Sequence, residues 1–244
     1  MTVGSVKTVT PRHEPCTATA LVRHCRAAGW ELTPDQADKL AVYLRLLMQW
    51  NGAMNLVGTH SWTETLNRLI FDSFELARFL SNDAQTEARA RADGNHAAYP
   101  RIWDLGAGAG LPGIPLRMVW PHGEYWLVEA REKRALFLST VLARISMPDT
   151  HVFRGRAQAF MPGRQADCIL SRAFMPWPDV LRLVRPHLAP AGQVILLTKD
   201  PIETRPINAA SPDTGWRIQA SACYQVGTDI RRLYALTSEK DISC

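Results

Sequence analysis

Hydrophobic residues recur at helical spacing through the first part of the chain. The Ala-rich stretch 17–28 predicts a short helix ended by Gly29. Thr33-Pro34-Asp35-Gln36 has the form of a capping box with proline at the first helical position, and apolar residues after it share one helical face. A second box, Ser61-Trp62-Thr63-Glu64, predicts one further helix whose apolar stripe reaches Leu80. We therefore expect a small helical unit.

After residue 100 the pattern changes to short apolar strands that alternate with helices. Strands are predicted at 101–105, 124–129, 151–154, 167–172 and 193–199, and helices at 113–120, 132–146 and 177–188. This alternation predicts a mostly parallel sheet with right-handed crossovers. Two further β-like runs, 216–226 and 230–237, are joined across Gly227-Thr228-Asp229, which predicts a closing antiparallel hairpin. The expected fold is α/β and Rossmann-like, with a seven-stranded sheet and an N-terminal helical extension.

Composition divides the chain into three expected segments. Residues 1–14 read as a flexible tail, 15–99 as the N-terminal helical region and a linker, and 100–244 as the α/β domain. The linker, 82–100, is polar, Ala-rich and broken by Asp93-Gly94-Asn95. No apolar run approaches the roughly 18 residues of a membrane span, and the N-terminus lacks the apolar core of a secretory signal. We expect a cytoplasmic location.

Positive charge is concentrated in the second part of the chain. Residues 1–100 contain 10 Lys and Arg against 10 Asp and Glu, whereas residues 101–244 contain 18 against 13. Segment 131–172 alone has eight basic and three acidic residues. Such a patch is typical of a polyanion-binding surface, although charge alone leaves open a solvated face in an arginine-rich protein. The five cysteines and seven histidines show no metal-ligand spacing, so neither a metal site nor a disulfide framework is expected.

A glycine-rich loop follows the first predicted strand, in the run Asp104-Leu105-Gly106-Ala107-Gly108-Ala109-Gly110. Ligands of open parallel sheets bind outside the carboxyl ends of the strands, and glycines let the backbone approach a ligand closely. The Asp104 carboxylate suits the ammonium group of S-adenosylmethionine. Glu129 ends the second strand, 23 residues after Gly106, where an acid can accept hydrogen bonds from ribose hydroxyls. The pattern favours an adenosyl cofactor.

The same loop also fits a dinucleotide fingerprint, because Gly108 to Gly113 reads G-x-G-x-x-G. A nicotinamide-dependent oxidoreductase is therefore the enzymatic alternative. The Asp104 carboxylate would be repelled by a pyrophosphate, and the terminal hairpin is typical of a methyltransferase sheet, so both favour a methyltransferase. The basic segment favours a nucleic-acid substrate. An RNA-binding module with a non-catalytic cofactor pocket is a second alternative, and a small-molecule methyltransferase is a third.

Several motifs are more specific than the loop. They are Trp50-Asn51-Gly52-Ala53-Met54-Asn55-Leu56, Asp72-Ser73, Asp104 to Gly113, Gly155-Arg156-Ala157 and Ser171-Arg172-Ala173, spread in order over residues 34–200. Together they resemble the bacterial 16S rRNA guanine-N7 methyltransferase family, RsmG, also called glucose-inhibited division protein B. The resemblance implies a class I S-adenosylmethionine methyltransferase fold and methyl transfer to N7 of one guanine of the small ribosomal subunit. Residue spacing and hydropathy predict no metal and no membrane partner. We expect a monomer.

The resemblance also places the binding residues. Those expected at the cofactor are Asp104, Gly106, Gly108, Gly110, Leu111, Glu129, Ala157, Gln158 and Arg172. Those expected on RNA, from their charge and their place after a strand, are Arg131, Lys133, Arg134 and Lys199. The chain departs from the family pattern twice. Gln158 stands where the family usually has Glu, and Leu69 follows Arg68 where the family often has His.

The implied reaction assigns no catalytic acid or base. Guanine N7 has a lone pair and no proton, so methylation requires positioning in line with the sulfonium methyl rather than a general base. Arg172 could donate to O6 of the guanine or to a phosphate, with a structural salt bridge as the alternative. Asn51 and Asn55 could line the cleft or cap the helix before them. Cys168 is expected in the core.

Overall fold

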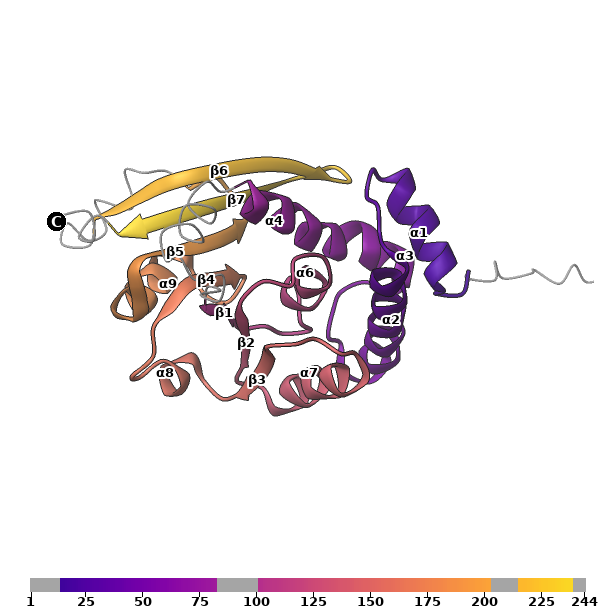
Figure 1. The fold of residues 1–244 in the computed structure, drawn as a ribbon, viewed down its shortest axis with the longest axis horizontal. Helices are drawn as coiled ribbons and strands as arrows, with labels where there is room; N and C mark the ends of the chain where they lie inside the picture. Colours follow the sequence, from indigo (N-terminus) through magenta and orange to yellow (C-terminus); the bar gives the residue numbers. More distant parts are fainter. Residues whose placement is uncertain (1–13, 83–100, 203–214, 239–244) are drawn as a thin grey trace, which may run out of the picture.

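The computed structural model describes residues 14–82, 101–202 and 215–238, and its centre is one seven-stranded sheet (Figure 1). The strands are β1 (Arg101–Leu105), β2 (Glu124–Glu129), β3 (Thr150–Arg154), β4 (Ala166–Arg172), β5 (Leu188–Thr198), β6 (Trp216–Val226) and β7 (Asp229–Ser238). Their order is β3-β2-β1-β4-β5-β7-β6. The first five are parallel, and β7 is antiparallel to both neighbours. The predicted parallel sheet with a closing hairpin is confirmed.

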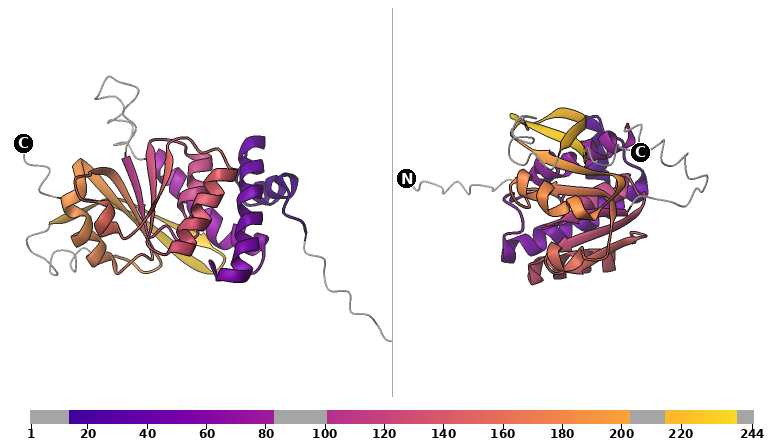
Figure 2. Two further views of the ribbon diagram at one scale, coloured as in Figure 1. Left: turned by 90° about the horizontal axis from the view of Figure 1, so that it is seen from below. Right: turned by 90° about the vertical axis from the view of Figure 1, so that its left-hand side faces the viewer.

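Alternating side chains along β1 show how the sheet is buried on both faces. Ile102 belongs to one hydrophobic cluster, whereas Trp103 and Leu105 belong to the other. The helices over the first face are α4 (Phe71–Ser81), α6 (Gly113–Val119) and α7 (Glu132–Arg144), and those over the second are α8 (Ala157–Phe160) and α9 (Trp177–Val184). Figure 2 shows these layers from below, with the N-terminal helices outside α7 and with α9 on the opposite side. Cys168 is buried in the first cluster, as expected.

The N-terminal helices extend the first of these two cores. Helix α1 spans Ala18–Ala27 and α2 spans Pro34–Met54, close to the predicted ranges. The predicted capping box of α2 is present, with the Thr33 side chain accepting from the Gln36 backbone and the Gln36 side chain accepting in return. Helix α2 packs against α6 and α7, and buried residues of α1, α2 and α4 share one cluster with β1, β2 and β4. The predicted tail (1–14, save its last residue), the predicted linker (82–100, save its first residue) and the boundary at 99–100 lie outside the described residues.

The helix predicted after Ser61 is not continuous, which corrects the sequence expectation. It consists of α3 (Trp62–Thr65), a π-helical turn η1 (Leu66–Ile70) and α4. A π-turn interrupts the regular hydrogen bonding of an α-helix over a few residues. Of the predicted stripe, Leu69 is half-buried and the other four residues are buried: Leu66, Ile70, Ala77 and Leu80. Helix α4 also buries Asp72, Ser73 and Phe74, which the prediction did not include.

Two smaller differences concern β5 and the helix before it. Helix α9 ends at Val184 and gives way to a 3-10 turn, η2 (Arg185–His187). Strand β5 begins at Leu188 rather than at residue 193, because Leu188 pairs with Ala166 before a register shift. Pro190 and Gly192 hid this irregular strand from a pattern-based prediction. Among the described helices, none has the length and hydropathy required to cross a membrane.

Candidate cofactor and substrate site

The predicted binding residues lie at one edge of the sheet. Because β1 to β5 are parallel, the segments that follow them leave the sheet at the same side. The glycine loop follows β1, Glu129 ends β2, and Ala157 begins α8 just after β3. Arg172 ends β4, and Lys199 follows β5. Topology therefore brings together residues that lie far apart in the sequence.

The glycine loop is tied to the end of β2 by backbone hydrogen bonds. The N–H groups of Gly106 and Ala107 both donate to the Val128 carbonyl, at 2.9 and 3.1 Å. The Gly108 N–H donates to the Glu129 carboxylate at 2.8 Å. Gly106, Gly108 and Gly110 have φ of 72°, 58° and 81°, a region that L-residues with a Cβ rarely adopt. The three glycines are therefore required by the path of the loop.

Glu129 connects this loop to the start of α7. One carboxylate oxygen accepts from Gly108, and the other accepts from the Arg131 N–H at 2.7 Å. A carboxylate oxygen can accept two hydrogen bonds, so each oxygen keeps capacity for a ligand hydroxyl. Glu129 thus both fixes the loop and matches the role expected for it toward a ribose.

Asp104 lies beneath the loop, where it is 1% exposed. The Tyr125 hydroxyl donates to its carboxylate at 3.3 Å, and a Cβ added at Gly113 would approach that carboxylate to 2.5 Å. Burial raises the pKa of Asp104 to about 7. In this structure the Asp104 carboxylate packs against Gly113 at the start of α6. Its contact with a cofactor ammonium stays a prediction.

The open side of the loop fits an adenosyl cofactor. A Cβ at Gly108 would have its nearest neighbours at 3.7 and 3.8 Å, the second of them the Arg134 guanidinium, so the backbone is accessible there. At Gly106, by contrast, a Cβ would lie 2.6 Å from the Phe174 ring. An accessible glycine backbone beside a carboxylate with free acceptor capacity suits the ribose and methionine parts of S-adenosylmethionine.

The remaining predicted residues differ in how far their side chains are exposed. Ala157 is buried at the start of α8, and Gln158 beside it is exposed. Leu111 is half-buried next to the glycines. At the start of α7 the side chains of Arg131 and Lys133 are exposed, while that of Arg134 is half-buried. Their contacts with cofactor or RNA stay predictions.

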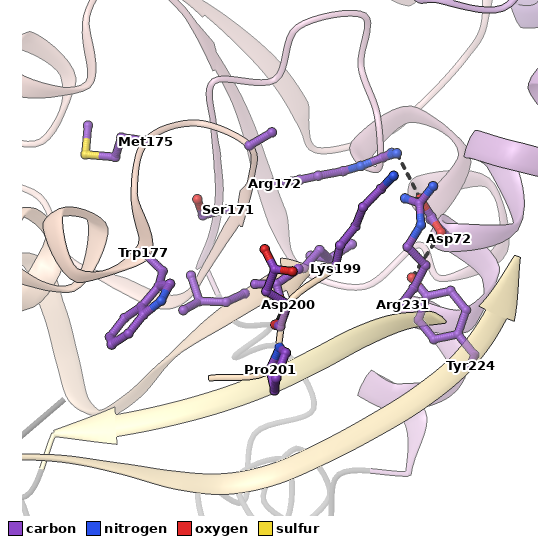
Figure 3. Close-up of a pocket in the computed structure, with 14 residues that line it drawn as sticks. Asp72, Ser171, Arg172, Met175, Trp177, Lys199, Asp200, Pro201, Tyr224 and Arg231 are labelled. Carbon is purple, nitrogen blue, oxygen red and sulfur yellow. Dashed lines mark hydrogen bonds and ion pairs between the residues drawn. The ribbon is translucent and has the colours of Figure 1, made fainter. Parts of the chain in front are cut away.

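A pocket of about 510 Å³ opens over the ends of β4, β5 and β7 (Figure 3). Arg172 and Lys199 line it, together with Asp200, while Met175 and Trp177 lie on the other side in the close-up. The Lys199 ammonium is 3.0 Å from the carboxylate of Asp229, and both side chains are exposed. The pocket thus has an aromatic side and a cationic side. It lies over β4, which is the neighbour of β1, the strand that leads into the glycine loop.

Sequence reasoning missed a buried ionic cluster in this pocket, centred on Asp72. Its carboxylate is 2.9 Å from Arg172 and 3.0 Å from Arg231, and it accepts a hydrogen bond from the Tyr224 hydroxyl at 3.1 Å. The salt-bridge alternative for Arg172 is therefore present. The one available signal was a polar Asp-Ser pair inside an otherwise apolar helical stretch.

The two asparagines of the Trp50-to-Leu56 motif have local roles. The Asn51 amide donates to the Thr59 carbonyl at 2.9 Å and accepts from the Val57 N–H at 2.8 Å. Asn55 ends α2 in the left-handed conformation, with φ of 47°. Both therefore shape the turn after α2, which agrees with the capping alternative.

The chain is similar to known methyltransferases over most of its length. The family model described as GidB, rRNA small subunit methyltransferase G, matches residues 36–211. The ribosomal RNA small subunit methyltransferase G of Nitratidesulfovibrio vulgaris strain DP4 is 49% identical, covering 84% of this chain and 86% of that protein. The protein of the same name from Oleidesulfovibrio alaskensis is 43% identical, covering 88% and 92%.

Solved structures resemble the chain more distantly. TrmN from Thermus thermophilus is 20% identical over 57% of this chain and 44% of its own, with a TM-score of 0.44. The ribosomal protein L11 methylase of Lactobacillus delbrueckii subsp. bulgaricus is 16% identical over 63% and 79%, with a TM-score of 0.47.

Proposed function

The chain belongs to the rRNA small subunit methyltransferase G family, and on that premise we propose that it methylates N7 of one guanine in 16S rRNA with S-adenosylmethionine. One observation carries the proposal. The glycine loop with Glu129 and the pocket walled by Arg172 lie at the same edge of the sheet, so a donor and an acceptor can meet there.

Each part of the edge has a separate task in this proposal. The loop backbone at Gly106 and Gly108 and the Glu129 carboxylate would hold the cofactor, with Ala157 and Gln158 beside the adenine. When bound, the cofactor supplies a methyl group activated by its sulfonium. Arg172 would orient the guanine by donating to O6, which leaves the neighbouring N7 free.

The reaction at N7 needs little acid–base chemistry from the protein. The N7 lone pair attacks directly, and no proton has to leave before the new N–C bond forms. The protein contributes by holding the base in line with the methyl group and by an environment that suits charge moving from sulfur to the base. We therefore assign positioning rather than proton transfer to Arg172.

A direct test measures methyl transfer to small ribosomal subunits from a strain that lacks the modification. We expect labelled methyl groups in 16S rRNA, mapped by cleavage at 7-methylguanosine. Label at an adenine or on a protein would contradict the proposal. RNA binding without methyl incorporation would instead support the non-catalytic module, whereas family membership gives the oxidoreductase no support. Naked rRNA as a parallel substrate identifies the form recognised. The monomeric state, the cytoplasmic location and the absence of a metal requirement stay predictions.

A further inference from the structure

Asp72 connects three segments that are distant in the sequence at one wall of the pocket. It comes from α4, Arg172 from the end of β4, and Tyr224 and Arg231 from the β6–β7 hairpin. Both guanidinium groups contact the same oxygen of Asp72, at 2.9 and 3.0 Å, and Tyr224 donates to the other oxygen. Figure 3 shows the two arginines converging on this carboxylate from different elements. An N-terminal helix thus contributes to the substrate side of the site.

A π-helical turn directly precedes the segment that carries Asp72. The π-helical turn η1 ends at Ile70, two residues before Asp72. Turns of this kind occur frequently at functional sites. The Asp72 carboxylate is 1% exposed, although a charged group in a helix would ordinarily face solvent.

Charge and hydrogen bonding in this cluster are not optimised for stability. Two guanidinium groups face one carboxylate, and the second acid nearby, Asp229, is 3.7 Å from Arg231 and also contacts Lys199. Among the described residues, Arg231 Nε and Ser73 Oγ are buried without a hydrogen-bond partner. Buried ionic groups contribute little to stability compared with apolar residues of the same volume. The cluster therefore fixes the orientation of the two arginines while adding little to the stability of the fold.

The remaining exposure of both arginines is consistent with a ligand in the pocket. Their side chains are 17% and 12% exposed, and both line the cavity. A guanidinium has five N–H donors, so a contact with Asp72 leaves others available. Guanine O6 is an acceptor next to N7, so a guanidinium that donates to O6 alone can hold the base and leave the N7 lone pair free. Across the pocket, the half-buried Trp177 offers a face on which an unstacked base can lie.

We propose that Asp72 is a positioning residue that holds Arg172 and Arg231 at the wall of the base pocket, so that they direct the acceptor edge of the target guanine toward the methyl donor. This inference rests on the proposed function, and it adds Asp72 and Arg231 to the residues expected from the sequence. Holding both guanidinium groups in place before the base enters removes the entropic cost of ordering them in the complex.

The test compares Asp72→Asn with a control on the same helix, Glu75→Gln. Asn is isosteric with Asp but neutral, and the Glu75 carboxylate pairs with Arg78 away from the pocket. For both variants the thermal unfolding midpoint, the affinity for S-adenosylhomocysteine and the single-turnover methylation of unmodified small subunits are measured. We expect Asp72→Asn to bind S-adenosylhomocysteine within about twofold of the unsubstituted protein while methylation slows by about tenfold to a hundredfold. Glu75→Gln should methylate normally.

A double variant separates positioning from charge compensation. Asp72→Asn combined with Arg231→Gln removes the buried positive charge that lost its partner, so the unfolding midpoint should recover while methylation stays slow. If methylation recovers with stability, or if Asp72→Asn methylates at the normal rate per folded molecule, the positioning role is overturned. Should Asp72→Asn fail to fold, Arg231→Lys gives the same comparison, because lysine keeps the charge but has no guanidinium fork. Normal methylation by Arg231→Lys would then overturn the role. Failure of the unsubstituted protein to methylate guanine would contradict the proposed function instead.

Discussion

Tyr43 and Ala109 are joined by a hydrogen bond of 2.8 Å that connects the N-terminal helices to the glycine loop. The hydroxyl of Tyr43, on α2, donates to the carbonyl of Ala109, between two glycines of the loop. Tyr43 is fully buried, and desolvation raises its pKa, so the hydroxyl stays protonated and remains a donor. The helical extension therefore supports the glycine loop directly.

Replacing Tyr43 by Phe removes the hydrogen bond to the glycine loop but keeps the aromatic ring in the core. We expect a loss of about 1 kcal/mol in the free energy of unfolding and an affinity for S-adenosylhomocysteine weaker by about threefold to tenfold. Calorimetric titration and urea unfolding measure the two quantities. Tyr234→Phe is the matched control, because that hydroxyl accepts from the Ile202 N–H away from the loop. An equal loss of affinity in both variants would contradict the proposed link.

Alanine substitutions should separate backbone strain from contact within the loop. Gly106 and Gly163 have similar φ, 72° and 74°, but a Cβ at Gly163 has no neighbour within 4 Å, whereas one at Gly106 overlaps the Phe174 ring. Gly163→Ala should cost about 1 kcal/mol of unfolding free energy and leave S-adenosylhomocysteine binding unchanged. Gly106→Ala should cost more and weaken binding by more than about tenfold. Similar results for both variants would show that Phe174 simply moves aside.

The raised pKa of Asp104 predicts an unusual dependence of stability on pH. Because the folded protein holds this proton up to a pKa of about 7, and an unfolded chain releases it near pH 4, the folded state binds more protons in between. The contribution of Asp104 to the free energy of unfolding should therefore decrease from about pH 4 to pH 7 and then level off. Asp104→Asn is neutral throughout and can accept the same hydrogen bonds.

Urea unfolding of both proteins at pH 5 and at pH 8 measures this difference. The variant should gain stability relative to the unsubstituted protein at the higher pH. A difference between the two proteins that is independent of pH would mean that Asp104 titrates normally in the folded state.

Charge reversal at the start of α7 tests the expected RNA surface. Arg131 and Lys133 are exposed beside the cofactor loop, so a double change to Glu should weaken binding to small subunits. Each phosphate contact that is lost should lower the slope of log affinity against log salt by about 0.7 to 0.9. The control is Arg26→Glu on α1, which reverses a charge outside the expected RNA surface, at an arginine that pairs with Glu31. An unchanged slope in the double variant would remove these residues from the interface.

Local patterns were sufficient for most of the secondary structure and for the place of the glycine loop after β1. The strands β1, β2 and β4 were predicted nearly to the residue, because burial on both faces leaves continuous apolar runs. The hairpin was predicted nearly as well, because Gly227-Thr228-Asp229 is a clear turn signal between two β-like runs. The interrupted helix before Asp72 was missed, since a π-turn has no characteristic residue pattern and periodicity alone predicts a regular helix. The irregular start of β5 was missed because proline and glycine there resemble a loop.

The sequence by itself determined the parallel sheet, the glycines that the loop backbone requires and the acid that ends β2, because each depends on neighbours along the chain. Only the tertiary structure decided that Asp104 is buried, that Tyr43 holds the loop across 66 positions, and that Asp72 meets Arg231 across 159 positions. These contacts depend on how α2, α4 and the hairpin pack together. Side-chain chemistry shows which residues can pair, but only packing brings two distant ones within hydrogen-bond distance.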